Sequence, residues 1–190
     1  MTRAPHRDDA HADDLEARIR AGDVRAFEQL FRAHYEPLCR FAFRYLLDRA
    51  LAEDLVQDLF AHLWADRARL ELRACARAYL FASVRNRALN VRKRQLVERD
   101  WERDEALPDV RRLHRAPIAP DHELDDRERD AGLRAAIESL PERCRMVMQL
   151  RWQEQMSHAE IATIMAISLK GVENQLSRGL HALRQRFGRS

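Results

Sequence analysis

The stretch Ser157–Phe187, SHAEIATIMAISLKGVENQLSRGLHALRQRF, decides the fold of the C-terminal part of the chain. Its apolar residues follow helical spacing, break over Ala166–Ser168 and then resume. Ser157 and Glu160 have the spacing of a capping box, which predicts that a helix begins just after Ser157. After the break, apolar residues in steps of three and four predict a longer second helix that Ser168 caps. They are Leu169, Val172, Leu176, Leu180, Leu183 and Phe187.

Two helices that meet at a tight corner and share a small core leave the second helix half exposed. This is the helix-turn-helix arrangement, in which the second helix enters the major groove of DNA. The face predicted to be exposed carries side chains that can read bases or bind phosphate groups. They are Lys170, Glu173, Asn174, Ser177 and Arg178, with Gln175 as a further candidate. By periodicity alone, an ordinary helical hairpin with a polar outer face remains an alternative.

The composition favours an all-α protein. The 190 residues include only five Gly and six Pro, and Ala, Leu, Arg and Glu dominate. No apolar run approaches the ~18–20 residues that span a bilayer, so no membrane insertion is expected. The polar residues 1–13 do not form a signal peptide, and we expect them to be a disordered lead-in.

The cysteines indicate a cytoplasmic protein without a metal site. Cys39, Cys75 and Cys144 are odd in number and far apart, which is typical of reduced thiols. None of the eight His residues clusters with a Cys at metal-binding spacing. Phosphate-binding loops and nucleophile motifs are also missing, so we predict no cofactor and no catalysis by this chain.

Charge is spread unevenly along the chain. Residues 51–66 hold four acidic residues and no Lys or Arg, whereas residues 67–99 hold ten basic residues against two acidic ones. Residues 100–130 are again acidic, and residues 131–190 carry a net charge of +4. Two basic blocks around an acidic spacer suggest two anion-binding modules on a tether. The alternative is a set of ordinary solvated helix faces.

Four helices are predicted before residue 100. The first covers Asp14–Ala21, Asp23 caps the second, and Asp48 caps the third. Pro37 lies inside the second helix, where we expect a kink or a restart. The fourth helix is expected from about residue 77 to residue 97. Residues 101–126 contain three prolines and many acidic residues, which predicts a linker, and a further helix is expected over residues 127–139.

Two parts of the chain resemble a known family. The segment Leu140–Gln185 resembles region four of bacterial RNA polymerase sigma factors. The segments AEDLVQDLFAHLW (Ala52–Trp64) and RAYLFASVRNRALNVRKR (Arg77–Arg94) resemble region two. The short linker between the regions resembles the small extracytoplasmic-function (ECF) group. The resemblance implies region two over residues 14–100, a linker over 101–126, and region four over 127–190.

The resemblance implies a factor that binds core RNA polymerase and directs transcription initiation, in a stress or cell-envelope response. The acidic helix would dock on the clamp of the largest polymerase subunit, and region four would meet the flap region. An anti-sigma factor would restrain the protein. The implied polymerase-binding residues are Glu53, Asp54, Gln57, Asp58 and Phe60.

Region two would read the promoter −10 element and hold one strand open, with the loop Glu71–Arg77 around an extruded base. The implied DNA-binding residues are Arg73, Arg77, Arg85, Asn86, Asn90, Arg92 and Lys93. Tyr79 and Phe81 are candidates for base stacking, but their helical spacing also suits core positions. Region four would read the −35 element with Glu173, Asn174, Ser177 and Arg178 facing the bases, and with Lys170 and Ser168 near phosphate groups. The family usually has Gly where this chain has Ala166, which leaves the geometry of the turn open.

Two other functions remain open from the residues alone. A stand-alone helix-turn-helix regulator would bind duplex DNA without polymerase. A helical adaptor or enzyme would lack a DNA role. The basic block at residues 67–99 argues against the adaptor, and the missing phosphate-binding loop and nucleophile motifs argue against the enzyme.

Overall fold

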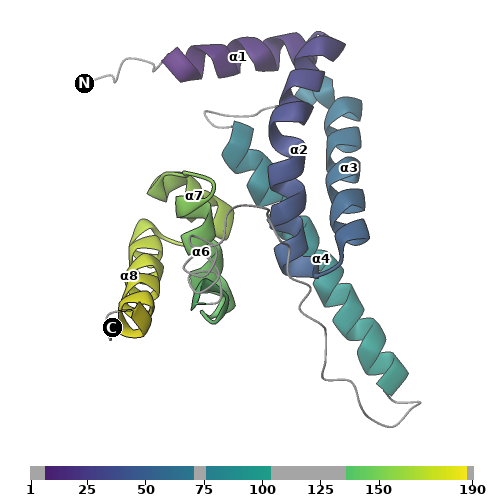
Figure 1. Cartoon of the computed structure of the whole chain (residues 1–190). Coiled ribbons are helices and arrows are strands. Elements are labelled where there is room, and N and C mark those ends of the chain that lie inside the picture. Colours follow the sequence, from purple (N-terminus) through teal and green to yellow (C-terminus); the bar gives the residue numbers. More distant parts are fainter. Residues whose placement is uncertain (1–6, 71–75, 104–135, 188–190) are drawn as a thin grey trace, which may run out of the picture. The chain divides into compact units, whose positions relative to one another are not determined.

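The computed structural model describes residues 7–70, 76–103 and 136–187 (Figure 1). Every regular element within these ranges is a helix, which confirms the predicted all-α class. The chain forms two compact units, one mainly of residues 1–98 and the other mainly of residues 99–162 and 167–190. In the described part of the chain, no helix is long and apolar enough to cross a membrane.

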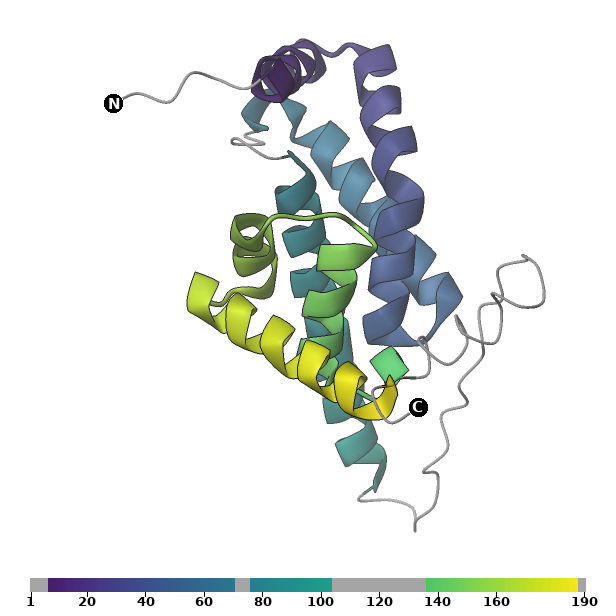
Figure 2. The same cartoon turned by 60° about the vertical axis from the view of Figure 1, so that its left-hand side comes forward.

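The first unit holds four α-helices and one short 3-10 helix. They are α1 (Arg7–Arg20), α2 (Val24–Leu46), α3 (Arg49–Ala65), η1 (Arg67–Arg69) and α4 (Ala76–Arg103). Helices α2 and α3 pack along each other, because only residues 47 and 48 separate them (Figures 1 and 2). Helix α4 joins this pair through Phe81, whose ring centroid lies 5.0 Å from that of Phe41 in α2. Both rings are fully buried, and each contributes ~1.5–3 kcal/mol of hydrophobic stabilisation.

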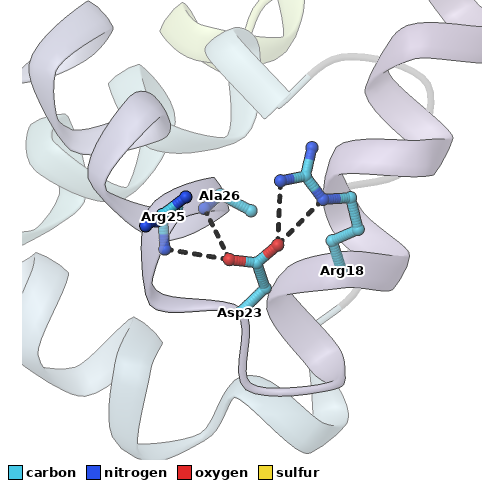
Figure 3. A network of polar contacts seen from close by, with 4 residues as sticks. All are labelled: Arg18, Asp23, Arg25 and Ala26. Atoms are coloured by element: carbon cyan, nitrogen blue, oxygen red, sulfur yellow. Dashed lines mark hydrogen bonds and ion pairs between the residues drawn. The ribbon is translucent and has the colours of Figure 1, made fainter.

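Aspartate side chains start α2 and α3, as the sequence predicts. One carboxylate oxygen of Asp23 accepts hydrogen bonds from the backbone N–H groups of Arg25 (2.9 Å) and Ala26 (3.2 Å) (Figure 3). The other oxygen accepts a hydrogen bond from Arg18 at 2.9 Å. These contacts lower the pKa of Asp23, mainly through the bond from Arg18. Asp48 accepts a hydrogen bond from the backbone N–H of Leu51 at 3.1 Å.

Three helix boundaries differ from the sequence-based expectations. Helix α1 begins at Arg7, inside the expected lead-in. Helix α2 is one continuous helix through Pro37, so the restart is absent and the kink stays a prediction. Helix α4 continues to Arg103, into the start of the expected linker. Most of the helix expected over 127–139 lies outside the described residues, which are helical there over 136–138.

The second unit contains α6 (Glu142–Trp152), most of α7 (His158–Met165) and α8 (Leu169–Phe187). Helices α6 and α8 pack side by side (Figures 1 and 2). The capping box before α7 is confirmed: Ser157 Oγ accepts from the backbone N–H of Glu160 (3.2 Å), and the Glu160 carboxylate accepts from the backbone N–H of Ser157 (2.7 Å). Ser168 Oγ accepts from the backbone N–H of Gly171 at 3.0 Å and so caps α8.

The turn between α7 and α8 contains a left-handed residue. Ala166 has a φ of 51°, and its N–H donates to the carbonyl of Thr163 at 3.3 Å. For a residue other than glycine this conformation costs ~1–2 kcal/mol. The chain therefore adopts the left-handed turn without the glycine that would relieve the strain.

The contact between α6 and α8 depends on Gly179. A Cβ atom at this position would lie 2.6 Å from Sδ of Met148 and 3.2 Å from Sγ of Cys144. Gly179 occupies the buried face of α8 together with Val172 and Leu176. Leu169 and Leu180 are instead exposed, so the predicted apolar stripe is wrong at these two positions.

Candidate nucleic-acid and protein interfaces

One exposed stripe runs along α4. Tyr79, Asn86, Asn90 and Lys93 follow one another in steps of seven, four and three residues, so they share one helix face. All four are exposed. The two asparagines can donate to and accept from base edges, and the lysine can bind phosphate groups. The stripe therefore places an aromatic ring, two amides and a cation in line on the surface.

The arginines predicted for the same function lie differently. Arg77, Arg85 and Arg92 are half-buried, on the side of α4 that carries the buried residues Phe81 and Ala88. The Arg77 guanidinium lies 5.8 Å from the centre of the Phe81 ring. The Nε atom of Arg85 is buried without a hydrogen-bond partner. Arg73 lies outside the described residues.

A pocket of about 350 Å³ lies where α3 ends and α4 begins. Its lining is partly apolar and partly charged, and it comes from α3, η1, the residues beside them and α4. The lining residues are Leu59, His62, Leu63, Asp66, Arg69, Leu70, Tyr79, Ser83 and Arg87. Tyr79 is 41% exposed at this pocket, whereas Phe81 is fully buried. Phe81 is therefore a core residue, and Tyr79 alone of the two can stack on a ligand.

The predicted acidic surface of α3 divides into two sides. Asp54 and Asp58 line a groove of about 340 Å³ whose other wall is α4. The groove is lined by Leu51, Asp54, Leu55, Asp58, Arg87, Asn90, Val91 and Arg94. The acidic residues of α3 and the polar face of α4 therefore meet in one groove, and Asn90 belongs to both surfaces.

Glu53 and Gln57 lie on the other side of α3. Glu53 forms an ion pair with Arg49 at 2.7 Å. The Gln57 amide donates to the hydroxyl of Tyr35 in α2 at 3.2 Å, and the Tyr35 ring stacks on Phe31 with centroids 4.7 Å apart. Tyr35 thus fixes the position of Gln57, a role that the sequence analysis missed because it depends on how α2 and α3 pack.

Phe60 does not belong to this surface. It is 2% exposed, and its ring lies between those of Phe31 (4.8 Å) and Phe27 (6.0 Å). The resemblance to region two implied that it belongs to the polymerase-binding residues. Its helical position, however, points it toward α2, where it belongs to the core.

The outer face of α8 carries the side chains that the sequence assigned to it, except Gln175, which is half-buried. Lys170, Glu173, Asn174, Ser177 and Arg178 are exposed and lie at helical spacing on one side. Lys170 and Glu173 form an ion pair at 3.1 Å. Asn174, Ser177 and Arg178 follow it along the helix and present a mixture of donors and acceptors. Ser168 is exposed at the start of α8, where its hydroxyl caps the helix.

The two cysteines within the described ranges lack the features of reactive or metal-binding thiols. Burial raises the pKa of both the Cys39 thiol and the Cys144 thiol, which keeps them protonated. The described residues contain no group of three His, Cys, Asp or Glu side chains that could hold a metal ion.

Comparison with known proteins identifies both units. Residues 30–96 match the family "Sigma-70 region 2", and residues 131–183 match "Sigma-70, region 4". The RNA polymerase sigma-E factor of Streptomyces coelicolor is 30% identical over 165 residues, which cover 86% of this chain and 87% of that protein. The ECF RNA polymerase sigma factor SigW of Bacillus subtilis is 21% identical over 173 residues, covering 89% and 92%.

Solved structures show the same fold. The sigma factor RpoE of Bartonella quintana, solved with the anti-sigma factor NepR, has a TM-score of 0.61 and 22% identity, covering 87% of this chain and 98% of that one. CnrH, solved with the cytosolic domain of CnrY, has a TM-score of 0.60 and 24% identity, covering 90% and 94%.

The chain therefore belongs to the RNA polymerase sigma factors of the sigma-70 family. Relatives named ECF sigma factors place it in the ECF group, which confirms the resemblance found in the sequence. As a sigma factor it acts in transcription initiation with RNA polymerase and promoter DNA, which decides against the stand-alone regulator and the adaptor.

Proposed function

We propose that α4 and the pocket beside it open the promoter −10 element, and that α8 reads the −35 element. The observation that carries this proposal is the position of Tyr79, which belongs both to the exposed stripe of α4 and to the lining of the pocket. A single DNA strand that runs along the stripe past Asn90 and Asn86 would reach the half-exposed ring of Tyr79. Base stacking on such a ring contributes ~1–3 kcal/mol per base.

The pocket has the composition that an unstacked base requires. Leu59, Leu63 and Leu70 supply apolar surface for the base, and Asp66 and Arg69 supply an acceptor and donors for its edge. Of the arginines assigned to DNA, Arg77, Arg85 and Arg92 are half-buried, and we expect them to bind phosphate groups rather than base edges.

On α8, we expect Asn174, Ser177 and Arg178 to contact bases in the major groove. An Asn side chain pairs with adenine and an Arg side chain with guanine, and each good bidentate pair contributes ~1–3 kcal/mol of discrimination. The ion pair between Lys170 and Glu173 constrains Glu173, so a contact from Glu173 to cytosine requires this pair to open. We expect Lys170 and Ser168 to lie near phosphate groups.

Polymerase docking is assigned to the polar residues of α3, namely Glu53, Asp54, Gln57 and Asp58, on the clamp of the largest subunit, with region four on the flap. The relatives RpoE and CnrH were solved with partner proteins, an anti-sigma factor in the first case. By analogy, we propose that an anti-sigma factor restrains this chain in the cytoplasm and that release follows an envelope or stress signal. Catalysis remains with the polymerase.

Run-off transcription tests the proposal directly. Core polymerase and the purified chain are incubated with a library of promoter fragments from the source genome, and the start sites are sequenced. We expect a defined set of start sites that shares two sequence elements and that core polymerase alone does not produce. Tyr79→Ala should weaken initiation from these promoters, whereas Tyr79→Phe, which keeps the ring, should retain it. An unchanged set of start sites with and without the chain refutes the function.

Polymerase docking needs a neutralising substitution rather than a charge reversal. Asp54 and Asp58 share their groove with Arg87 and Arg94, so lysines at these positions would also repel α4. The pair Asp54→Asn and Asp58→Asn keeps the shape and removes only the charge. We expect the double variant to lose core polymerase in a pull-down while far-UV circular dichroism stays unchanged. Glu28→Gln, on an exposed part of α2, controls for the loss of one acidic charge outside α3.

A further inference from the structure

The N-terminal helix reaches the wall of the pocket through one arginine. Arg20, the last residue of α1, donates a hydrogen bond from Nε to the backbone carbonyl of Leu70, 2.5 Å away and fifty residues further along the chain. Its guanidinium also pairs with Glu16, one turn earlier in α1. The Arg20 side chain is therefore held from within its own helix while it binds the other segment.

Leu70 is a structural part of the pocket. Its side chain is 5% exposed and lines the pocket together with its neighbour Arg69. The backbone N–H of Leu70 donates to the carbonyl of Arg67 at 3.1 Å, at the end of η1. The carbonyl of Leu70 accepts the bond from Arg20, so both sides of this residue's backbone are fixed.

The end of α1 that carries Arg20 is itself fixed in place. Ile19 is fully buried, and Gly22 has a φ of 88°, a left-handed conformation that lets the chain turn sharply into α2. Arg18 then pairs with the cap residue Asp23 of α2 at 2.8 Å (Figure 3). Because this corner is held on both sides, Arg20 projects from a rigid support.

We propose that Arg20 is a positioning residue for strand opening, which holds Leu70 and Arg69 in place so that the pocket is already formed when a base arrives. The inference rests on the proposed function of the pocket. Without the bond from Arg20, the pocket wall formed by Leu70 and Arg69 can move. Base capture must then also order this wall, and the cost of the ordering weakens capture. α1, which carries none of the DNA-binding residues assigned from the sequence, thereby takes part in promoter opening.

A bond with a purely structural role would affect every function of the unit alike. The positioning role instead predicts an effect that depends on the extruded base. The test uses the holoenzyme at a promoter found by the run-off experiment. Opening at equilibrium is measured by permanganate reactivity, first on the intact promoter and then on templates with one abasic nucleotide at each position of the −10 element. The template on which wild-type opening falls most identifies the extruded base.

We expect Arg20→Ala to lower opening of the intact promoter about threefold to tenfold, the range that loss of one hydrogen bond gives. On the template that lacks the extruded base, the variant and the wild type should open equally. Core polymerase binding should stay unchanged. Arg25→Ala, which removes an exposed arginine at the start of α2, controls for the lost charge and should act equally on both templates. Arg20→Lys keeps the charge and the helix, so it serves if Arg20→Ala does not fold, and the same base-dependent loss is expected to be smaller.

Two results overturn the inference while leaving the proposed function intact: a variant that opens the intact promoter as well as the wild type, or one that is equally weakened on both templates. A wild-type holoenzyme for which no abasic position matters would overturn the proposed pocket function and this inference together.

Discussion

The close contact between α6 and α8 yields the most direct test of the region-four core. Replacing Gly179 by Ala adds a Cβ atom 2.6 Å from Sδ and 2.8 Å from Cγ of Met148, and both distances are shorter than real Cβ contacts. Met148 is 3% exposed, so its side chain has little room to move away. Overpacking of this kind costs ~1–3 kcal/mol. Alanine is a better helix former than glycine by about 1 kcal/mol, which offsets part of that cost.

We therefore expect Gly179→Ala to destabilise α8 by up to about 2 kcal/mol, the balance of these two terms. Hydrogen exchange of the α8 amides in the full-length protein measures this locally, and a loss of this size speeds exchange by up to about thirtyfold. Gly171→Ala is the matched control, because its nearest contact, to Cβ of Ile167, is 3.3 Å away. It gains the same helix propensity without a contact below 3.0 Å, so its exchange should change much less.

A double-mutant cycle with Met148→Ala identifies the cause. Met148→Ala alone should cost ~2–5 kcal/mol, because it leaves a cavity in the core. In that background the new methyl group of Gly179→Ala occupies vacated space, so the second substitution should be neutral or stabilising. If Gly179→Ala slows exchange in the wild-type background, or costs the same in both backgrounds, the close-contact explanation is refuted.

Three further predictions concern other parts of the chain. Ala166→Gly should stabilise the turn before α8 by about 0.5–1 kcal/mol, because relief of left-handed strain exceeds the greater entropy of glycine; a lower melting temperature would contradict this. Tyr35→Phe removes only the hydroxyl that binds Gln57, so core polymerase affinity should fall by a few-fold while the melting temperature changes little; equal affinity would mean that the position of Gln57 does not matter. The folded-state pKa of Asp23 lies below its ordinary value of 3.8, so its contribution to stability is present above that pH and is lost on acidification below it. Asp23→Asn should accordingly flatten the fall in melting temperature below about pH 4, and an unchanged acid profile would count against the role of Arg18.

Helix starts were predictable because their causes are local. Asp23, Asp48 and Ser168 each bond to a backbone N–H two or three residues ahead, and the chain itself fixes that distance. The capping box at Ser157 depends likewise on a spacing of three. Helical periodicity also predicts which face of α8 is exposed, because it places Asn174 and Val172 on different faces of the helix.

Packing between helices was not predictable in the same way. In the sequence, Gly179 predicts only a weaker helix. The structure shows that the missing side chain is required, because Met148 lies where a Cβ atom would come too close. The resemblance to region two implied that Phe60 binds polymerase, yet the rings of α2 surround it. The apolar steps along α8 include Leu180, although the helix packs against α6 through the residue before it. In each case, the deciding atoms belong to another element.

Packing between helices also decides how the acidic surface of α3 and the polar face of α4 act together. Asp54 and Asp58 come from an acidic part of the sequence and Arg87 and Arg94 from a basic part, yet all four line one groove. Exposed charges influence one another over a Debye length of about 8 Å at physiological salt, and all four residues line the same groove. The acidic residues therefore lower the positive potential that promoter phosphate groups meet on this side of α4.

A polymerase clamp that engages Asp54 and Asp58 with basic residues would neutralise them and strengthen the attraction of α4 for DNA. On this argument, free region two should bind single-stranded DNA more weakly than the same region in holoenzyme, and Asp54→Asn with Asp58→Asn should raise DNA affinity of the free chain while lowering affinity for polymerase.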